Sequence, residues 1–342
     1  MKLIKGLLTS MALICAISNG AFAQEDFAEF MKESVADGEK LISAYISPAM
    51  NSLSSGLNQG WYNTAKPHKV AGFDLTINFN AMTIPSNELF FDVSKLNLTE
   101  IELDPSSPDY GDAPNAPTVF GPDRAPTFRL KDDPSQTFEG APGIDLKKNI
   151  GQNIMPVPTV HFAFGLPKGT EVKFRFVPKL NLGDEMDFNL FGIGVLHDVK
   201  QWIPGIKSLP FDLSAFAGYT NMKVAVTIPD DAYREDAKGE MSINAATVQG
   251  IISKKISILT VYGGMGYNVA TSKLALLGSF DVNQDGDYAD TREVNPVALD
   301  FSASGPRMTA GFRLKLAVLT LHADYTLQKY KALTVGLGIN VR

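Results

Sequence analysis

The stretch Thr170–Pro178, TEVKFRFVP, alternates strictly between apolar and charged residues. Successive side chains of an extended chain point to opposite faces, so this stretch has one apolar and one charged face. The apolar face holds Val172, Phe174 and Phe176, and the charged face holds Glu171, Lys173 and Arg175. In a soluble protein the apolar face would pack into a core. In a membrane barrel it would meet lipid, and the charges would line the lumen. The rest of the chain has to decide between these two folds.

Residues 1–23 have the features of a secretory leader. Lys2 and Lys5 precede the apolar run GLLTSMALICAI, and Ala21-Phe22-Ala23 is a small-x-small cleavage site before Gln24. Cys15 is the only cysteine and lies inside this run. We therefore expect an exported chain that is cleaved after Ala23 and has no disulfide or reactive thiolate.

Composition narrows the classes of function. The formal net charge of −6 argues against a general nucleic-acid binder. No segment after the leader has the length and apolarity of a membrane-spanning helix. The mean hydropathy of −0.01 is ordinary for a soluble protein. It also fits a barrel, because a transmembrane strand needs only about ten residues, half of them apolar.

Residues 24–66 differ in character from the rest of the chain. Apolar residues recur at helical spacing in EDFAEFMKESVADGEKLISAYI, and Pro48 is expected to end or bend this helix. We interpret the segment as a helical plug, or hatch, in the barrel lumen. Two other placements stay open: on the periplasmic rim, or against a partner protein.

From Val70 onwards a period of two dominates, apart from residues 103–157, which are rich in Pro, Asp and Gly and loop-like. Residues 67–342 therefore predict an antiparallel transmembrane β-barrel in an all-β fold. Short connections near 167–169, 254–257 and 316–318 alternate with long polar connections near 229–240 and 281–306. A two-sheet sandwich is the soluble alternative, but its strands average about five or six residues. The run PFDLSAFAGYTNMKVAVTI is far longer. Counting back from the last residue gives about nine strands, and an even total then predicts 12 to 14, depending on how many strands lie between Val70 and Leu130.

A barrel fixes which side chains face the lumen. Val172, Phe174 and Phe176 are expected to meet lipid. Charged and polar residues of alternating strands are expected in the lumen: Glu171, Lys173, Arg175, Arg313, Lys315, His322 and Asp324, together with Lys223. The cations either favour anions or pair with Glu171, Asp187 and Asp212, and pairing is preferred because buried charges are usually paired.

The loop DVNQDGDYAD is the best local motif for a ligand. Asp281, Asn283, Asp285 and Asp287 recur at every second residue, with Gly286 at the turn, as in a calcium-binding loop. The twelfth position is Arg292 instead of Glu, with Glu293 one place later. The loop is either a Ca²⁺ site, which would be the one cofactor of the chain, or a polar turn-rich loop.

The remaining residues give no motif for catalysis. None of the four histidines has a second His or Cys at ligand spacing, so we expect no zinc or iron site. His322 and Asp324 are expected to form a hydrogen-bonded pair. The segment SASGP, residues 302–306, lacks the Gly-x-Ser-x-Gly pattern of a nucleophile elbow. We therefore expect the protein not to be an enzyme.

Several segments resemble a family of uncharacterised Gram-negative outer-membrane barrels. They are the leader, GWYNTAKPH, KVAGFDLTINFNAM, FGIGVLHDVKQWIPGIKSLPFDLSAFAGYT and LTLHADYTLQKYKALTVGLGINVR. The order of parts is also similar to that of the outer-membrane long-chain fatty-acid transporters, in which a hatch plugs a barrel that binds hydrophobic ligands.

The resemblance implies an outer-membrane location and passage or capture of small hydrophobic solutes, as in a porin-like transporter. The alternative is a structural or assembly-partner protein that acts through its long extracellular loops. The expected partners are outer-membrane lipid, a hydrophobic small-molecule ligand and the outer-membrane assembly machinery.

Overall fold

Strict alternation produces long two-faced strands. The computed structural model describes residues 34–111, 113–181, 186–228, 234–280 and 294–341. In β1 (Phe73–Thr83), FDLTINFNAMT, the apolar side chains of the first seven residues are exposed and the polar ones are buried. The buried side chains are Asp74, Thr76 and Asn78. An exposed apolar face and a buried polar face are the reverse of a soluble sheet.

The strands of this kind form one antiparallel sheet. Besides β1 they are β7 (Ile154–Leu166), β8 (Thr170–Asn181), β9 (Met186–Asp198), β10 (Asp212–Thr227), β11 (Arg234–Ile256), β12 (Leu259–Phe280), β13 (Val297–Ser302), β14 (Gly305–Leu316), β15 (Leu319–Leu327) and β16 (Ala332–Val341). Pairing of β11 with β12 and of β1 with both β7 and β16 closes the sheet into a barrel. The expected all-β antiparallel barrel is confirmed.

The strand number differs from the expected 12 to 14. The sheet has eleven strands, of which β13 pairs only with β12, so the closed ring has ten. The nine strands counted back from the last residue are present when β13 and β14 are taken as one interrupted strand. The segment before them adds β1 alone. The total stays even, but the region between Val70 and Leu130 was assigned too many strands.

Residues 84–153 form a small folded unit, the cap, between β1 and β7. Its β-strands have only three or four residues each, too short to cross a bilayer. Side chains of these strands form an apolar cluster that includes Ile101 and Phe128 together with Leu41. The elements are η1 (Ser86–Glu88), β2 (Phe90–Asp92), η2 (Val93–Leu96), β3 (Ile101–Leu103), β4 (Asn115–Pro117), β5 (Thr127–Leu130), β6 (Thr137–Glu139) and α4 (Leu146–Ile150).

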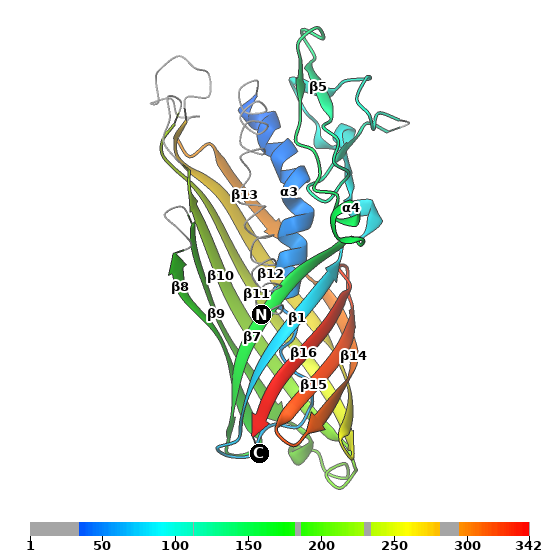
Figure 1. The fold of residues 1–342 in the computed structure, drawn as a ribbon, viewed down its shortest axis with the longest axis vertical. Coiled ribbons are helices and arrows are strands. Elements are labelled where there is room, and N and C mark those ends of the chain that lie inside the picture. Colours follow the sequence, from blue (N-terminus) through cyan, green and yellow to red (C-terminus); the bar gives the residue numbers. More distant parts are fainter. Residues whose placement is uncertain (1–33, 112, 182–185, 229–233, 281–293, 342) are drawn as a thin grey trace.

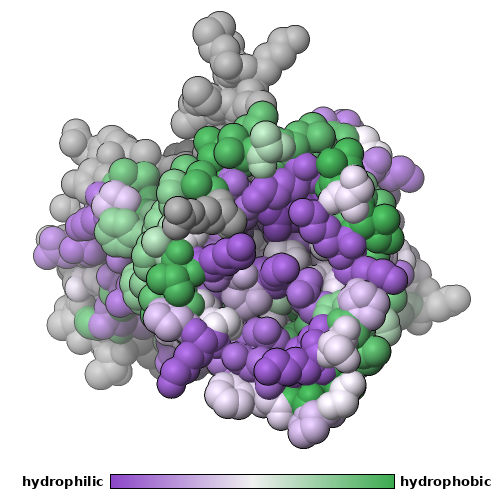
Figure 2. All heavy atoms as spheres, turned by 90° about the horizontal axis from the view of Figure 1, so that it is seen from below, coloured by the Kyte–Doolittle hydropathy of each residue, from purple (hydrophilic) through white to green (hydrophobic). Residues whose placement is uncertain are grey.

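The two ends of the barrel differ (Figure 1). The tight-turn rim, at the bottom of the figure, carries the connections β7–β8, β11–β12 and β14–β15 and the end of β16. One longer connection, with η3 (Lys200–Trp202), also lies there. The loop rim at the top carries the cap. Seen from the tight-turn rim, hydrophilic residues fill the middle and hydrophobic residues surround them (Figure 2).

Helix α3 (Val35–Leu57) runs down into the barrel from the loop rim (Figure 1). The Ser34 side chain accepts a hydrogen bond from the backbone N–H of Asp37 and caps the helix. The helix continues through Pro48 and does not end there. Its apolar side chains pack against the inner faces of β7 and β9 to β13, and this packing compensates for the missing hydrogen bond. No helix in the described ranges is long and apolar enough to span a membrane.

The lumen is divided into two halves. Around α3 its wall is apolar and includes Met155, Val157 and Met222. Below the end of α3 the wall is polar and charged, with buried side chains from β1, β7, β8, β14, β15 and β16. The lumen segment, residues 58–68, passes through this polar half and leads to β1 at the tight-turn rim.

Candidate functional site in the barrel lumen

Two arginines of the barrel wall bind the backbone carbonyl groups at and just after the C-terminus of α3. Arg175 of β8 donates from Nη1 to the Leu57 carbonyl at 2.6 Å and from Nη2 to the Gln59 carbonyl. Arg307 of β14 donates to the Asn58 carbonyl at 2.8 Å and to the Gln59 side chain at 2.7 Å. Helix ends leave carbonyl groups unpaired and carry partial negative charge, so buried cations are favourable there. We call this pair the arginine lock.

An aromatic cluster lies in the lumen next to the lock. The Arg175 guanidinium lies 3.6 Å from the centroid of the Trp61 ring, and Trp61 packs on Phe216 at 5.6 Å between centroids. Trp61 is 1% exposed. Gly194 and Gly218 leave the space for these rings, since a Cβ at either position would lie within 3.1 Å of them. Cation–π stacking adds to the hydrogen bonds that fix Arg175.

Tyrosine side chains link the lumen segment to strands β11, β12 and β15 of the barrel wall. The Tyr62 hydroxyl donates to Gln249 Oε1 at 2.6 Å. Tyr262 packs edge-on against Tyr62 and donates its own hydroxyl proton to Asp324 Oδ2 at 2.9 Å. Further along the chain, Ala65 is held through its backbone N–H and carbonyl by serine hydroxyls of β11 and β10. The lumen segment is therefore tied to several strands.

His68 ends the lumen segment in a buried charged cluster near the tight-turn rim. Its backbone N–H donates to Glu171 Oε2 at 2.8 Å, and its Nδ1 lies 2.5 Å from the same oxygen. Lys173 Nζ pairs with Glu171 Oε1 at 2.6 Å. On the other side of the ring, the Asn340 amide lies 2.5 Å from Nε2, and Lys315 donates to the Asn340 side chain.

The same cluster contains the best arrangement of potential metal ligands in the described part of the chain. One ligand atom each of His68, Asp74 and Glu171 lies within 4.8 Å of the other two. Both Glu171 oxygens, however, already accept hydrogen bonds, and Lys173 neutralises the carboxylate. His161 Nε2 lies 3.6 Å from Asp74. Charge compensation by protein groups makes this a poor site for a divalent cation, so we assign no metal there.

The residues expected in the lumen are found as follows. Glu171, Lys173, Arg175, Arg313, His322 and Asp324 are buried inside the barrel, and Lys315 is half-buried at its lower end. His322 lies 3.5 Å from the Asn63 amide, and Asp324 accepts from Tyr262, so the expected His322–Asp324 pair is not the contact made. Lys223 is exposed, because Met222 and Val224 take the inward positions. Asp281, Asn283, Asp285 and Asp287 lie outside the described residues.

Sequence spacing missed that His68 and His161 approach the same carboxylate, with their Nε2 atoms 3.7 and 3.6 Å from Asp74. They come from the lumen segment and β7, which are far apart in the sequence. The partners of the arginine lock were also missed. Every residue has a backbone carbonyl group, so the sequence does not show which of them an arginine will bind.

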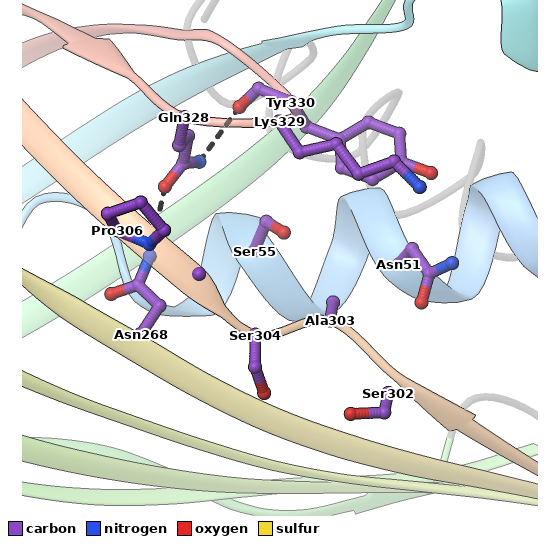
Figure 3. A pocket seen from close by; sticks show the side chains of 11 residues that line it. Asn51, Ser55, Asn268, Ser302, Ala303, Ser304, Pro306, Gln328, Lys329 and Tyr330 are labelled. Atoms are coloured by element: carbon purple, nitrogen blue, oxygen red, sulfur yellow. Dashed lines mark hydrogen bonds between the residues drawn. The ribbon is translucent and has the colours of Figure 1, made fainter.

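The barrel wall is incomplete in two places near the loop rim. We call the first the seam: β7 pairs with β8 only from Phe162 to Leu166, which leaves residues 154–161 without a strand partner on that side. We call the second the notch: β12 pairs with β14 and then with β13, and Ala303–Ser304 separate the two. The notch holds a cavity of about 200 Å³ over α3 (Figure 3).

Comparison with protein families gives a full-length match. The model of a family of unknown function, DUF6588, matches residues 1–341. The chain belongs to this family. Membership of an uncharacterised family is thus as expected, whereas the comparisons do not single out the fatty-acid transporters. No curated protein matches the DUF6588 chain.

Three similar solved structures are distant in sequence and shape. The translocator domain of the autotransporter NalP from Neisseria meningitidis has a TM-score of 0.30 at 10% identity, over 86% of this chain and 93% of that one. The TodX deltaS2S3 mutant, a monoaromatic hydrocarbon channel, has 0.23 at 6%, over 86% and 70%. OmpTdeltaL8 of Vibrio cholerae has 0.19 at 10%, over 79% and 99%. At these values the likeness carries no argument about function.

Proposed function

We propose that this DUF6588 protein is a plugged outer-membrane barrel that captures small hydrophobic solutes and passes them sideways through its wall. The exposed apolar belt around a polar interior supports a membrane location (Figure 2). The proposal of a sideways route through the wall rests on the seam between β7 and β8.

The seam is an open strand edge marked by proline. Gly165 of β7 both donates to and accepts from the β1 side, through Gly72 and Ala71. Backbone direction alternates along a strand, so Pro156 and Pro158 face β8 with the nitrogen that has no proton. The register of β8 against β9 also shifts between Val177 and Leu180. Proline at an unpaired edge and a bulge opposite it both keep two strands apart.

The seam lies beside the apolar half of the lumen. Met155 and Val157, on the inner side of β7, belong to the apolar cluster that surrounds α3. The arginine lock and Trp61 close the lumen below this cluster. A solute in the upper half therefore has an apolar wall, an obstructed way down and an open strand edge beside it. Burial of apolar surface favours hydrophobic solutes there, at about 25 cal/mol per Å².

Closing the seam tests the proposal. Continuing the β7–β8 register places Val160 opposite Phe176, and both side chains are exposed. We would make Val160→Cys/Phe176→Cys and link the thiols with a flexible bismaleimide. The assay is uptake of the hydrophobic dye N-phenyl-1-naphthylamine by intact cells that express the protein. Linking is expected to abolish the uptake that exceeds the level of cells without the protein.

The matched control links a part of the two strands that is already paired. Phe164 and Val172 are register partners, so Phe164→Cys/Val172→Cys receives the same linker without closing the seam. Its uptake should equal that of the unlinked protein. Equal uptake before and after linking of the seam pair would reject the sideways route.

The cap supports a second candidate, a partner-binding protein of the outer membrane. It has its own apolar core and is joined to α3 by Asp37, which accepts from the backbone N–H groups of Thr99, Glu100 and Ile101. Thr83 and Ile154 are register partners, so an Asn-Gly turn can replace residues 84–153. A barrel without the cap that keeps its dye uptake would assign the cap to partner binding. Loss of uptake would place the cap in the solute path.

A further inference from the structure

The notch connects an internal cavity with the outer wall. β13 has β12 as its neighbour on one side. On its other side no described strand pairs with it, since β15 already ends at Leu327. Figure 3 shows Asn51 and Ser55 on α3 between two walls of the cavity, with Gln328 and Tyr330 on one side and Ser302 and Ser304 on the other. The helix surface is thereby reached from outside the barrel.

The cavity is rich in hydrogen-bonding groups. Asn51, Ser55, Asn268, Ser302, Ser304 and Gln328 all contribute to its lining. Asn51 is 9% exposed, and its Nδ2 donates to the Ser47 hydroxyl at 3.0 Å. Its Oδ1 is buried and has no hydrogen-bond partner within the described residues. An unpaired buried carbonyl is costly, so a donor supplied by a ligand would be favourable there.

The outer side of the notch is an apolar groove. Met265, Met308 and Leu327 line it with exposed side chains, and their strands carry them on the outward face. The groove and the cavity share Ser304, Gly305, Pro306, Gln328 and Lys329. Lys329 pairs with Glu88 at 2.8 Å, and exposed Lys331 lies at the edge of the groove. From the cavity outwards, the lining therefore changes from polar groups to lysine side chains and then to apolar side chains.

We propose that the notch binds a single-chain membrane amphiphile with a glycerol phosphate headgroup. A cavity of about 200 Å³ corresponds to about seven waters at about 30 Å³ each, which is enough for such a headgroup. The hydroxyl groups of the glycerol donate to Asn51 Oδ1 and exchange hydrogen bonds with the serines. The phosphate lies by Lys331, and the acyl chain follows Met265, Met308 and Leu327.

The proposal rests on the membrane location in the proposed function but not on solute passage. We would introduce Leu327→Cys and attach bimane, since the only native cysteine, Cys15, lies in the expected leader. The labelled protein in nanodiscs is titrated with lysophosphatidylglycerol that carries a nitroxide quencher on its acyl chain. Leu321→Cys is the matched control, because Leu321 is also exposed on the outward face of β15, further from the notch.

Binding in the notch predicts saturable quenching at position 327 and only linear quenching at 321. Asn51→Leu should raise the half-saturating concentration at least tenfold, and unlabelled palmitic acid should compete at least tenfold less well than unlabelled lysophosphatidylglycerol. Equal linear quenching at both positions would show simple partitioning and overturn the proposal. If quenching is saturable but Asn51→Leu does not change the half-saturating concentration, or if palmitic acid competes equally well, the role of the headgroup is overturned. Failure of dye uptake in the seam experiment would leave this result unaffected.

Discussion

Arg175→Met tests whether the arginine lock keeps the plug in place. The substitution keeps an apolar stem of similar length but removes both hydrogen bonds to the carbonyl groups of Leu57 and Gln59. A hydrogen bond from a charged donor contributes about 1.5–3 kcal/mol, so the two contribute about 3–6 kcal/mol. Stacking on Trp61 adds up to about 2 kcal/mol.

The hydrogen-bond values are already net of desolvation, so the substitution should weaken plug docking by at least about 3 kcal/mol. One factor of ten corresponds to about 1.4 kcal/mol, so the undocked fraction should rise at least about 100-fold.

The assay is ion conductance of the refolded protein in a planar bilayer. Wild type should be silent, Arg175→Met should open in brief events, and Arg175→Met/Arg307→Met should open more often. Deletion of residues 24–65 should conduct continuously. Arg129→Met is the control, because Arg129 pairs with Glu102 and Asp104 in the cap, away from the lumen. A silent Arg175→Met beside a conducting deletion would refute the lock, and a silent deletion would refute the plug as the barrier.

Three further substitutions concern other contacts of α3 and the lumen segment. Gly60→Ala should weaken plug docking by at least about 1–2 kcal/mol, because Gly60 has a φ of 66° and a Cβ would lie 2.7 Å from Asn78 Nδ2. Brief conductance events should therefore appear in this variant. Asp37→Asn should loosen the cap from α3, seen as faster proteolysis of residues 84–153 at neutral pH. Burial raises the pKa of Asp37, but hydrogen bonds from Glu100, Thr99 and Ile101 together outweigh it and hold the pKa below its usual range. The stabilisation of cap docking by Asp37 is therefore present above the unfolded pKa and is lost as the pH falls through the lower folded pKa. The proteolysis rate of wild type should thus approach that of Asp37→Asn only in strong acid. His68→Leu removes the side-chain contacts to Glu171 and Asn340 and should also raise conductance, because the lumen segment loses its lower anchor.

Local patterns predicted the wall of the barrel well. In TEVKFRFVP, side-chain direction depends only on the alternation of the strand, and Glu171, Lys173 and Arg175 indeed lie inside while Phe174 and Phe176 are exposed. The strand number was wrong because pairing is not local. Residues around Phe90 and Ile101 have β-forming sequences, but their strands have three residues each and pair within the cap.

The seam could have been recognised from the sequence. Pro156 and Pro158, two residues apart in IMPVPTV, remove two donors from one edge of the strand, which indicates an edge without a partner. The notch gave a weaker signal, since Gly305 and Pro306 mark a break without saying what lies behind it. Asn51 could not be assigned to it, because its place depends on how far α3 descends into the barrel.

The proposed function separates two kinds of permeability. In this proposal an ion has to pass the polar half, past Arg175 and Trp61, so ion conductance depends on undocking of the plug. A hydrophobic solute that uses the seam remains in the apolar half and leaves through the wall, so its passage does not require the plug to move. We therefore expect Arg175→Met to raise conductance without raising dye uptake, and linkage of Val160→Cys/Phe176→Cys to stop dye uptake without changing the low conductance. If both readouts rise together in Arg175→Met, solute and ions share one path through the lumen, and the sideways route is wrong.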